Sequence, residues 1–263
     1  SRLHTLGSLN ATSASSIALN SADATLQVDG SLQLAANINL IAADLARVEV
    51  GGSCFSYFQT DENLVQLGDA IVQFTGNGDQ FLEVGGIDID FVVQILTNEN
   101  FGFGQLIVGQ PGVPTSVQLI SDIDNGNSGG MNPEALYLFG EGPNNGLQIH
   151  SGSTLILTEF NLYVFDDDGL GASINGMRIN DLFPAPLGDP NVLDWPGGGF
   201  VQLAAAHCFG DVDLSGFIDV NDLLDLLAAW GPCPGSCPAD IDCDGFVNVV
   251  DLLNLLAGWG ACP

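Results

Sequence analysis

Short runs of alternating apolar and polar residues dominate residues 1–206. The runs are rich in Val, Ile, Leu and Phe, and turn residues such as Gly, Asn and Asp separate them. This period of two predicts β-strands, and the Asn-Gly pairs between runs predict tight turns. The clearest predicted strands are 25–28, 31–34, 70–74, 105–108, 117–120, 135–139, 147–150 and 154–157. We therefore expect a mainly β body.

A weak repeat, x-[LV]-x-[VI]-x-[GS], runs through this body. Its units begin at or next to Leu26, Val48, Leu82, Leu106 and Leu147. Two of the intervals, 22 and 24 residues, match one coil of a parallel β-helix, whereas the intervals of 34 and 41 residues require insertions. We predict a parallel β-helix or solenoid, with a β-sandwich or jelly roll as the alternative.

The pattern changes at residue 207. Residues 208–234 and 237–263 align without a gap, which indicates duplicated structural units. In each repeat an Asp- and Gly-rich loop precedes an apolar run that predicts a short helix, at 222–230 and 251–259, ended by Gly231 and Gly260. Helices this short need a neighbour that buries their leucines. We therefore divide the chain into a β-rich body, 1–206, and a small α module, 207–263.

Both loops have the spacing of a calcium site. Oxygen ligands are expected at loop positions 1, 3, 5 and 12 and from the carbonyl at position 7, and glycine at position 6 allows the sharp turn. The first loop offers Asp211, Asp213, Ser215, Asp222 and the Phe217 carbonyl. The second loop offers Asp240, Asp242, Asp244, Asp251 and the Phe246 carbonyl. Asp219 and Asn248, at position 9, would act through water. We predict two calcium ions, one per repeat.

The two repeats resemble a dockerin module, in the Cys- and Trp-Gly-rich form found at the C-termini of many secreted bacterial proteins. The resemblance covers residues 208–263 and implies two loop–helix halves related by a pseudo-twofold axis. It also implies calcium as cofactor and a cohesin-like or cell-surface partner. Dockerins that bind cohesins often carry polar residues at loop positions 10 and 11 and a Lys-Arg pair in the helix. Those places hold Val220-Asn221 and Val249-Val250, then Leu227-Ala228 and Leu256-Ala257. Calcium binding is therefore better supported than cohesin binding.

The cysteines of the module follow the repeat and leave two symmetric pairings. Either each repeat closes on itself, through Cys208–Cys233 and Cys237–Cys262, or Cys208–Cys262 clasps the module termini and Cys233–Cys237 forms a short staple. Because the termini of dockerins lie close together, the resemblance favours the clasp. Cys54 and Cys243 then either tie the module to the body or stay free.

Composition narrows the class of partner. The chain has 32 acidic residues, three arginines and no lysine, for a net charge of −29. Phosphate binding needs Lys and Arg, so we expect neither nucleic acid nor membrane as a partner. The polar first residues are typical of a mature chain whose leader has been removed. Five of the six cysteines crowd into the module, which indicates a secreted, extracellular or cell-surface protein.

We identify no catalytic constellation in the sequence. The three histidines lie far apart, and the nucleophile-elbow and phosphate-loop motifs are absent. The most suggestive acidic clusters are Asp166-Asp167-Asp168-Gly169 and Asp122-Ile123-Asp124-Asn125-Gly126. We interpret these clusters as solvated turns. If they are functional, we expect further calcium sites rather than catalytic pairs.

We therefore expect a calcium-binding structural protein that is not an enzyme and that associates with copies of itself as a homo-oligomer or filament. The open strand edges of a β-solenoid are templates for another chain, and a head-to-tail contact extends into a filament unless it closes. Two alternatives remain. The protein is a cohesin-bound component of a multi-protein complex, or it is a carbohydrate-active hydrolase with an Asp pair that the pattern does not reveal.

Overall fold

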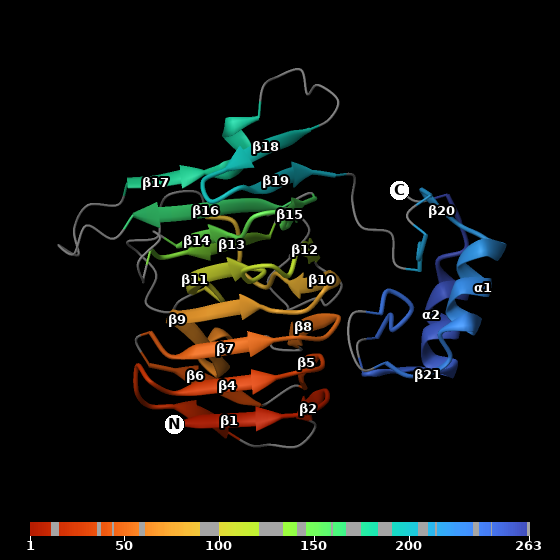
Figure 1. The fold of residues 1–263 in the computed structure, drawn as a ribbon, viewed down its shortest axis with the longest axis horizontal. Coiled ribbons are helices and arrows are strands. Elements are labelled where there is room, and N and C mark those ends of the chain that lie inside the picture. The colour runs from red at the N-terminus through yellow and green to blue at the C-terminus, as the bar shows by residue number, and fades with distance from the viewer. Residues whose placement is uncertain are drawn as a thin grey trace.

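A computed structural model gives the fold of the chain (Figure 1). It describes residues 1–11, 16–35, 38–43, 45–57, 61–89, 100–120, 134–140, 146–158, 160–166, 175–183, 191–204, 210–213, 215–233, 237–242 and 244–261. The β-rich body and the C-terminal module lie side by side, and the two helices of the module are on its outer side (Figure 1). Within the described residues, no helix has the length and apolar character needed to cross a membrane.

Two sheets form the body. The first sheet contains β1 (Arg2–Thr5), β3 (Ser16–Leu19), β4 (Thr25–Val28), β6 (Asn39–Ala42), β7 (Arg47–Val50), β9 (Val65–Phe74), β11 (Phe103–Val108), β13 (Ala135–Leu138), β14 (Leu147–Ile149), β16 (Asn161–Asp166) and β17 (Asn175–Arg178). The second contains β2 (Leu9–Ala11), β5 (Leu32–Leu34), β8 (Cys54–Tyr57), β10 (Gly78–Glu83), β12 (Thr115–Ile120), β15 (Thr154–Leu157), β18 (Val192–Trp195) and β19 (Gly199–Leu203). Among the described residues of the body, the 3-10 helices are η1 (Glu62–Leu64) and η3 (Ile179–Leu182).

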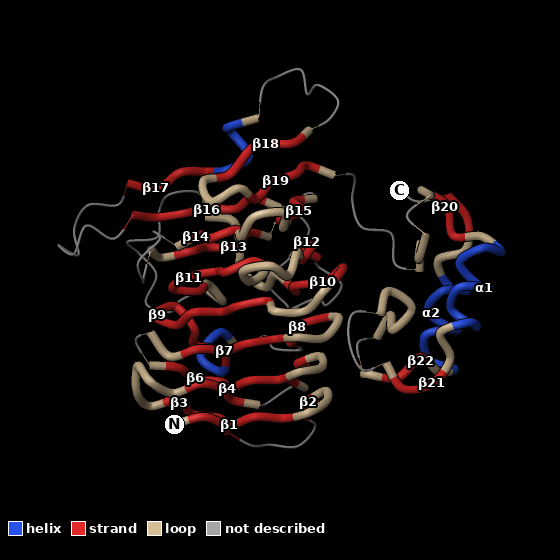
Figure 2. Tube along the Cα trace, in the orientation of Figure 1, coloured by secondary structure: helices blue, strands red, loops and turns tan. Residues whose placement is uncertain are grey.

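Most strands of the body pair in parallel (Figure 2), and from β1 through β4 and β7 to β9 the chain returns to the first sheet every 22 to 24 residues. In the first sheet Arg2 pairs with Thr25, Thr25 with Arg47, and Arg47 with Ile71. Among these named strands, antiparallel pairing is confined to β16–β17 and β18–β19. The parallel pairing contradicts the predicted alternative of a β-sandwich, whose sheets are antiparallel.

The predicted strands are all present, and β9 begins earlier than predicted, at Val65. Alternate residues of the strands turn inward, as Leu26 and Val28 do in β4, and are fully or almost fully buried. Inward-facing side chains of both sheets join in one apolar core, which includes Phe55 and Phe74. Burial of such side chains contributes about 1.5–3 kcal/mol each, so this core is the main source of stability in the body.

Four of the five units of the weak repeat lie in the first sheet, but the predicted 24-residue interval from Leu82 to Leu106 joins strands of different sheets. The stack in the first sheet runs from Val48 to Val72, then to Leu106 and Leu147. Leu82 lies in β10, in the second sheet, so its inclusion in the stack was wrong. Strands of both sheets place alternate apolar residues in the same core and end near glycine, so the pattern alone does not distinguish the two sheets.

Glycines at one turn of the body let successive coils of the chain come very close. The amide of Gly52 donates a hydrogen bond to the carbonyl of Gly30 at 2.9 Å, and the amide of Gly30 donates to the carbonyl of Gly7 at 3.3 Å. A Cβ on Gly52 would lie 2.2 Å from backbone atoms of Gly30 and Ser31, and one on Gly30 would lie 2.3 Å from the Ser8 amide nitrogen. No side chain fits at either position without moving the backbone.

The module contains two helices and two short antiparallel ladders. Its elements are α1 (Val220–Ala228), α2 (Val249–Ala257), β20 (Phe217–Ile218), β21 (Gly231–Pro232), β22 (Phe246–Val247) and β23 (Gly260–Ala261). The ladders are crossed: β20 of the first repeat pairs with β23 of the second, and β21 of the first pairs with β22 of the second. A small core that includes Leu226 and Leu255 lies beneath the helices. Each repeat is therefore completed by the other.

Both helices begin two residues earlier than predicted. Asp219 and Asn248 are their N-cap residues, and each side chain accepts a hydrogen bond from a backbone amide of the first turn. The predicted ends were also wrong, because Gly231 and Gly260 lie beyond the helices in β21 and β23, with φ of +121° and +132°. The pairing of these strands with the opposite repeat fixes their position.

Candidate metal centres

Three carboxylates converge in the first loop. Asp211, Asp213 and Asp222 each offer an oxygen, and these oxygens lie within 4.8 Å of one another. Asp222 is the third residue of α1 and is fully buried; its Oδ1 accepts hydrogen bonds from the amides of Val212, at 2.7 Å, and Asp213, at 3.1 Å. The start of the helix therefore holds the start of the loop.

Three carboxylates also converge in the second loop, from Asp240, Asp242 and Asp244, within the same 4.8 Å. The Gly245 amide donates to Asp240 Oδ2 at 3.0 Å. Gly245 has φ of +88°, so glycine at loop position 6 makes the turn that brings its amide to this carboxylate. In each loop three of the four predicted side-chain ligands thus come together.

The remaining predicted ligands have other partners. The Ser215 hydroxyl donates to the Phe217 carbonyl at 3.1 Å, so the two predicted oxygens of the first loop lie against each other. Asp251 is not part of the second triad: its oxygens accept from the amides of Asp242, at 3.1 Å, and Asn248, at 2.7 Å. The Phe246 carbonyl accepts from the Asn248 side-chain amide at 3.2 Å.

Helix capping is a role that the sequence reasoning missed. Asp219 and Asn248 were predicted to act through water at loop position 9, but each caps a helix and completes a capping box with the carboxylate three residues later. The sequence carries this information, because Asp-x-x-Asp and Asn-x-x-Asp place a cap and its reciprocal acceptor at the correct spacing. Residue 12 of each loop therefore has a structural role as well as its predicted ligand role.

The second triad is partly buried: Asp240 is buried, and Asp242 and Asp244 are half-buried. Asp240 is only 2% exposed; burial, and then the neighbouring carboxylate of Asp251, raise its pKa from 3.8 to about 7, although the Gly245 amide opposes the shift. Burial, and then Asp251 and Asp244, raise the pKa of Asp242 to about 6. Asp240 Oδ1 is buried and has no hydrogen-bond partner among the described residues. A bound cation would supply that partner and would offset the repulsion.

The donor set indicates which cation fits. Both triads consist of carboxylates alone, and residues 208–263 contain nine aspartates and no Lys or Arg. Hard oxygen ligands suit Ca²⁺, whereas Zn²⁺ sites use Cys and His as their main ligands. The residues of both loops therefore fit a hard divalent cation such as calcium.

The raised pKa values predict a pH dependence for this binding. Calcium requires ionised carboxylates, so affinity at the second loop should fall as pH drops through about 7 and then about 6, where Asp240 and Asp242 take up protons. Binding at pH 6.5 should release about one proton at this loop, and binding at pH 8.5 almost none. Calorimetric titrations in two buffers of different ionisation enthalpy measure this number. Equal proton release at both pH values would contradict the prediction.

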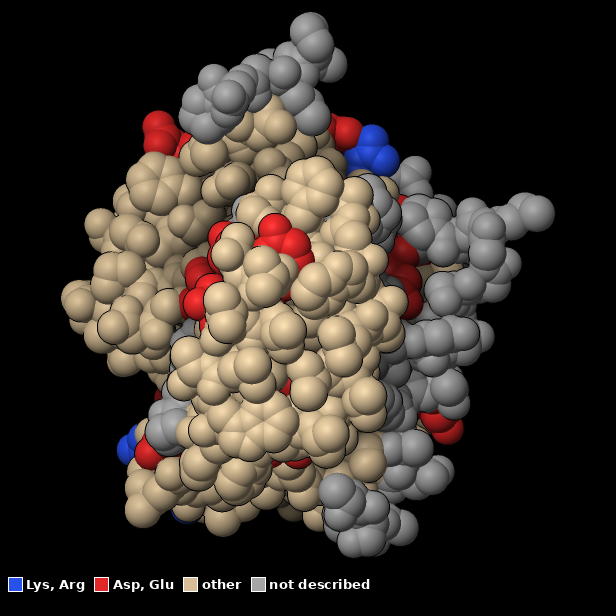
Figure 3. Space-filling view, turned by 90° about the vertical axis from the view of Figure 1, so that its right-hand side faces the viewer, with Lys and Arg blue, Asp and Glu red and all other residues tan. Residues whose placement is uncertain are grey.

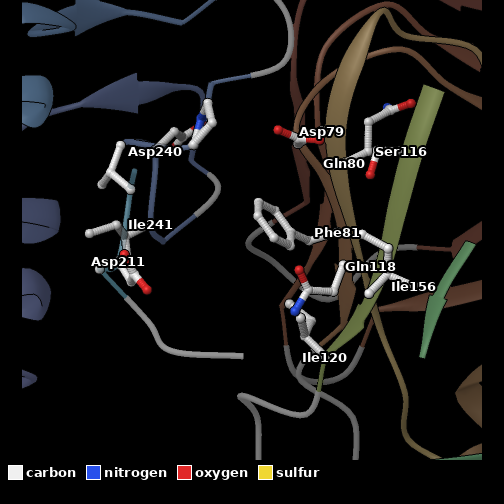
Figure 4. Close-up of a pocket in the computed structure, with 13 residues that line it drawn as sticks. Asp79, Gln80, Phe81, Ser116, Gln118, Ile120, Ile156, Asp211, Asp240 and Ile241 are labelled. Carbon is white, nitrogen blue, oxygen red and sulfur yellow. The ribbon is translucent and has the colours of Figure 1, made fainter. Parts of the chain in front are cut away.

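A cleft separates the body from the module (Figure 4). Its space is about 650 Å³, including the solvent at its mouth. Strands β10, β12 and β15 form one wall, with Phe81 and Ile156 among its side chains. Asp211 and Asp240, the first residues of the two predicted calcium loops, line the opposite wall. The loops thus lie toward the body and the helices away from it.

The disulfides settle part of the predicted connectivity. Cys233 and Cys237 are joined, with their Cα atoms 6.1 Å apart, so the predicted staple is confirmed. The alternative in which each repeat closes on itself is therefore wrong. Cys54 is also disulfide-bonded, so it is not a free thiol. Cys208, Cys243 and Cys262 lie outside the described residues.

The acidic clusters that were singled out in the body lie almost entirely outside the described residues, because only Asp166, the last residue of β16, is described. The structure reveals two buried glutamates near Tyr57, Glu83 and Glu134, that the sequence pattern did not indicate. Burial raises the pKa of Tyr57, and the carboxylates of Glu83 and Glu134 raise it further. These two glutamates are 0% and 4% exposed, so a polysaccharide chain cannot reach them in this conformation.

Comparison of the chain with protein-family models, with curated proteins and with solved structures found no match. The dockerin resemblance therefore rests on the residues of the two repeats, and the functional proposals rest on the site itself.

Proposed function

We propose that the protein is a secreted structural protein without enzymatic activity. Its dockerin-like module would bind two calcium ions and join copies of the protein through the outer face of its helices. We further propose that the body is a parallel β-helix that carries the module. The single observation that supports this function best is the large apolar surface on the module.

Eleven large apolar side chains form this surface, which we call the helical face. They are Phe217, Val220, Leu224, Leu227, Trp230, Phe246, Val249, Val250, Leu253, Leu256 and Trp259, each 44–60% exposed. Figure 3 views the molecule from the module side, and uncharged atoms cover most of the surface in front. Equivalent residues of the two repeats are equally exposed, as Leu224 and Leu253 are at 58% and 60%.

The size of the helical face supports a protein partner. Eleven such side chains at about half exposure amount to on the order of 1,000 Å² of apolar surface, more than the largest apolar patch of roughly 300–600 Å² on a typical monomer. A specific interface buries about 800 Å² on each partner, so this face is large enough for one.

The charge of the helical face favours a second copy of the chain as the partner. Asp225 is the one charged residue among the exposed positions of α1, and α2 exposes none. Such a surface offers little to a partner recognised by charge, but it can pack against an equally uncharged apolar surface. Calcium assists, since two ions reduce the charge of residues 208–263 from −9 to −5 and weaken the repulsion between copies.

The other parts of the proposal rest on separate observations. Calcium is supported by the two carboxylate triads and by the buried Asp240 oxygen. A secreted location is supported by the disulfides, which persist in oxidising compartments. A cohesin-like partner remains the second candidate, because the same helical face could receive it.

We expect the full-length protein to be a dimer in millimolar calcium, because a twofold contact between helical faces buries both and closes. Sedimentation velocity measures the mass. The double variant Leu224→Asp/Leu253→Asp should be monomeric at concentrations where the wild type is dimeric. Leu6→Asp is the control, because Leu6 is 86% exposed on the body and outside the helical face. A wild type that stays monomeric at high concentration with calcium would contradict self-association and favour a separate partner.

A further inference from the structure

The second calcium loop is attached to the body by side chains of the second sheet. The side-chain amide of Gln33, in β5, donates to the Asp242 carbonyl at 3.0 Å. The side-chain amide of Asn10, in β2, donates to the Asp244 carbonyl at 2.9 Å. Asn10 and Gln33 are paired in the parallel register of β2 and β5, so they form one row across the sheet. Asn10 and Gln33 therefore bind the backbone of the second loop at its positions 3 and 5, Asp242 and Asp244, from the side of the body.

Two further contacts bring the second repeat against the same sheet. The Cys237 amide donates to the Ser53 hydroxyl, next to β8, at 3.0 Å. Gly245 lies so close to Ser8 that a Cβ at this glycine would be 2.5 Å from the Ser8 hydroxyl oxygen. The second loop therefore packs directly on the body, and a larger residue at position 6 would require Ser8 to move.

The first loop differs. For residues 212–222, the hydrogen bonds that the structure describes stay within the module, as those from Val212 and Asp213 to Asp222 do. The two loops share six of their twelve residues and differ at the predicted ligand of position 5, which is Ser215 in the first loop and Asp244 in the second. The described hydrogen bonds of the second loop reach the body, whereas those of residues 212–222 do not. Their calcium affinities need not be equal.

A covalent bond also joins the two parts. Cys54, in β8, is buried and disulfide-bonded. Cys233 and Cys237 are bonded to each other, so the partner of Cys54 is one of the three other cysteines, all of which belong to the module. Cys243 stands in the chain between Asp242 and Asp244, whose carbonyls the neighbouring strands β5 and β2 hold. The geometry therefore favours Cys243 as the partner.

We propose that Asn10, Gln33 and the Cys54 disulfide position the second loop, so that it binds calcium more tightly than the first. The carbonyls of Asp242 and Asp244 are not predicted ligands, so the body can hold them without competing for the ion. Carboxylate repulsion would spread the loop in the absence of calcium. A loop already held near its bound shape loses less conformational entropy on binding. This proposal rests on the calcium part of the proposed function.

Calcium titration of the full-length protein by calorimetry tests the proposal. Asp211→Ala leaves the second loop as the measured site, and Asp240→Ala leaves the first. We expect the second loop to bind roughly fivefold to a hundredfold more tightly, because two hydrogen bonds to the body hold it near its bound shape. Asn10→Ala/Gln33→Ala, made in the Asp211→Ala protein, should weaken calcium binding at the second loop by a similar factor. The same pair in the Asp240→Ala protein should leave the first loop unchanged.

The matched control is Gln110→Ala, which removes a side-chain amide that donates to the Thr75 carbonyl at 3.0 Å within the body. It should leave both affinities unchanged. Circular dichroism in millimolar calcium checks that each variant folds, and Asp211→Asn and Asp240→Asn replace any alanine variant that does not. Equal affinities at the two loops, or no effect of the Asn10 and Gln33 substitutions, would overturn the proposal. Absence of any calcium binding would instead overturn the calcium assignment.

Peptide mapping without reduction tests the covalent part. We expect a peptide that joins Cys54 to Cys243. A bond from Cys54 to Cys208 or Cys262 would attach the body elsewhere in the module and would overturn the role given to the disulfide.

Discussion

Removal of calcium is expected to unwind α1 and α2 and to lower the melting temperature of the protein. Each ion present at one hundred times its dissociation constant contributes about 2.7 kcal/mol to the folded state. The module has little else to replace this contribution. Its core includes one fully buried leucine from each helix, Leu226 and Leu255, and nine-residue helices are marginal on their own.

Far-UV circular dichroism and calorimetry, with calcium and with excess chelator, measure the effect. Asp211→Ala and Asp240→Ala should each abolish one site and retain the other. The protein carrying both substitutions is the control, because chelator should no longer change its helix content or its melting. Unchanged helix content and melting of the wild type in chelator would contradict a structural role for calcium.

Gly52→Ala is expected to destabilise the body by about 3 kcal/mol, the upper part of the range for overpacking. The added Cβ would meet backbone atoms of Gly30 and Ser31 at 2.2 Å. Backbone at a turn between paired strands cannot move aside as a flexible side chain can, so the two coils must separate locally. Gly30→Ala should have a similar effect, because its Cβ would meet the Ser8 amide.

Gly7→Ala is the matched control for both. No atom lies within 4 Å of the position that its Cβ would occupy, so the change should alter stability by less than about 0.5 kcal/mol. Urea denaturation of the three variants and the wild type measures the difference. Equal stability of Gly52→Ala and Gly7→Ala would show that the coils do not approach as closely as the structure indicates.

Local features of this protein could be predicted from its sequence. Alternation located the strands, because inward positions such as Leu26 and Val28 face a common core. The loop spacing brought Asp240, Asp242 and Asp244 together, because ligands within five residues of a glycine turn need no distant contact. The position of β10 could not be predicted, because both sheets face the same core.

Features that depend on contacts between distant parts of the chain could not be predicted from the sequence. Leucines cover both helices almost all round, so their periodicity gave no preference for the side that would be buried. The packing of the module leaves Leu224 and Leu253 on the outside and encloses Leu226 and Leu255. The hydrogen bonds of Gln33 and Asn10 to the second loop span 209 and 234 residues, so no local sequence pattern predicts them.

The crossed ladders of the module limit how it can be shortened. A chain that stopped after the first repeat would keep β20 and β21 but lose both of their partner strands, β23 and β22. Two such half-modules could restore the ladders only by exchanging strands with each other, which is the geometry of a domain-swapped dimer. A single loop–helix unit is thus stable as one half of a symmetric pair, and the duplication places both halves of that pair in one polypeptide.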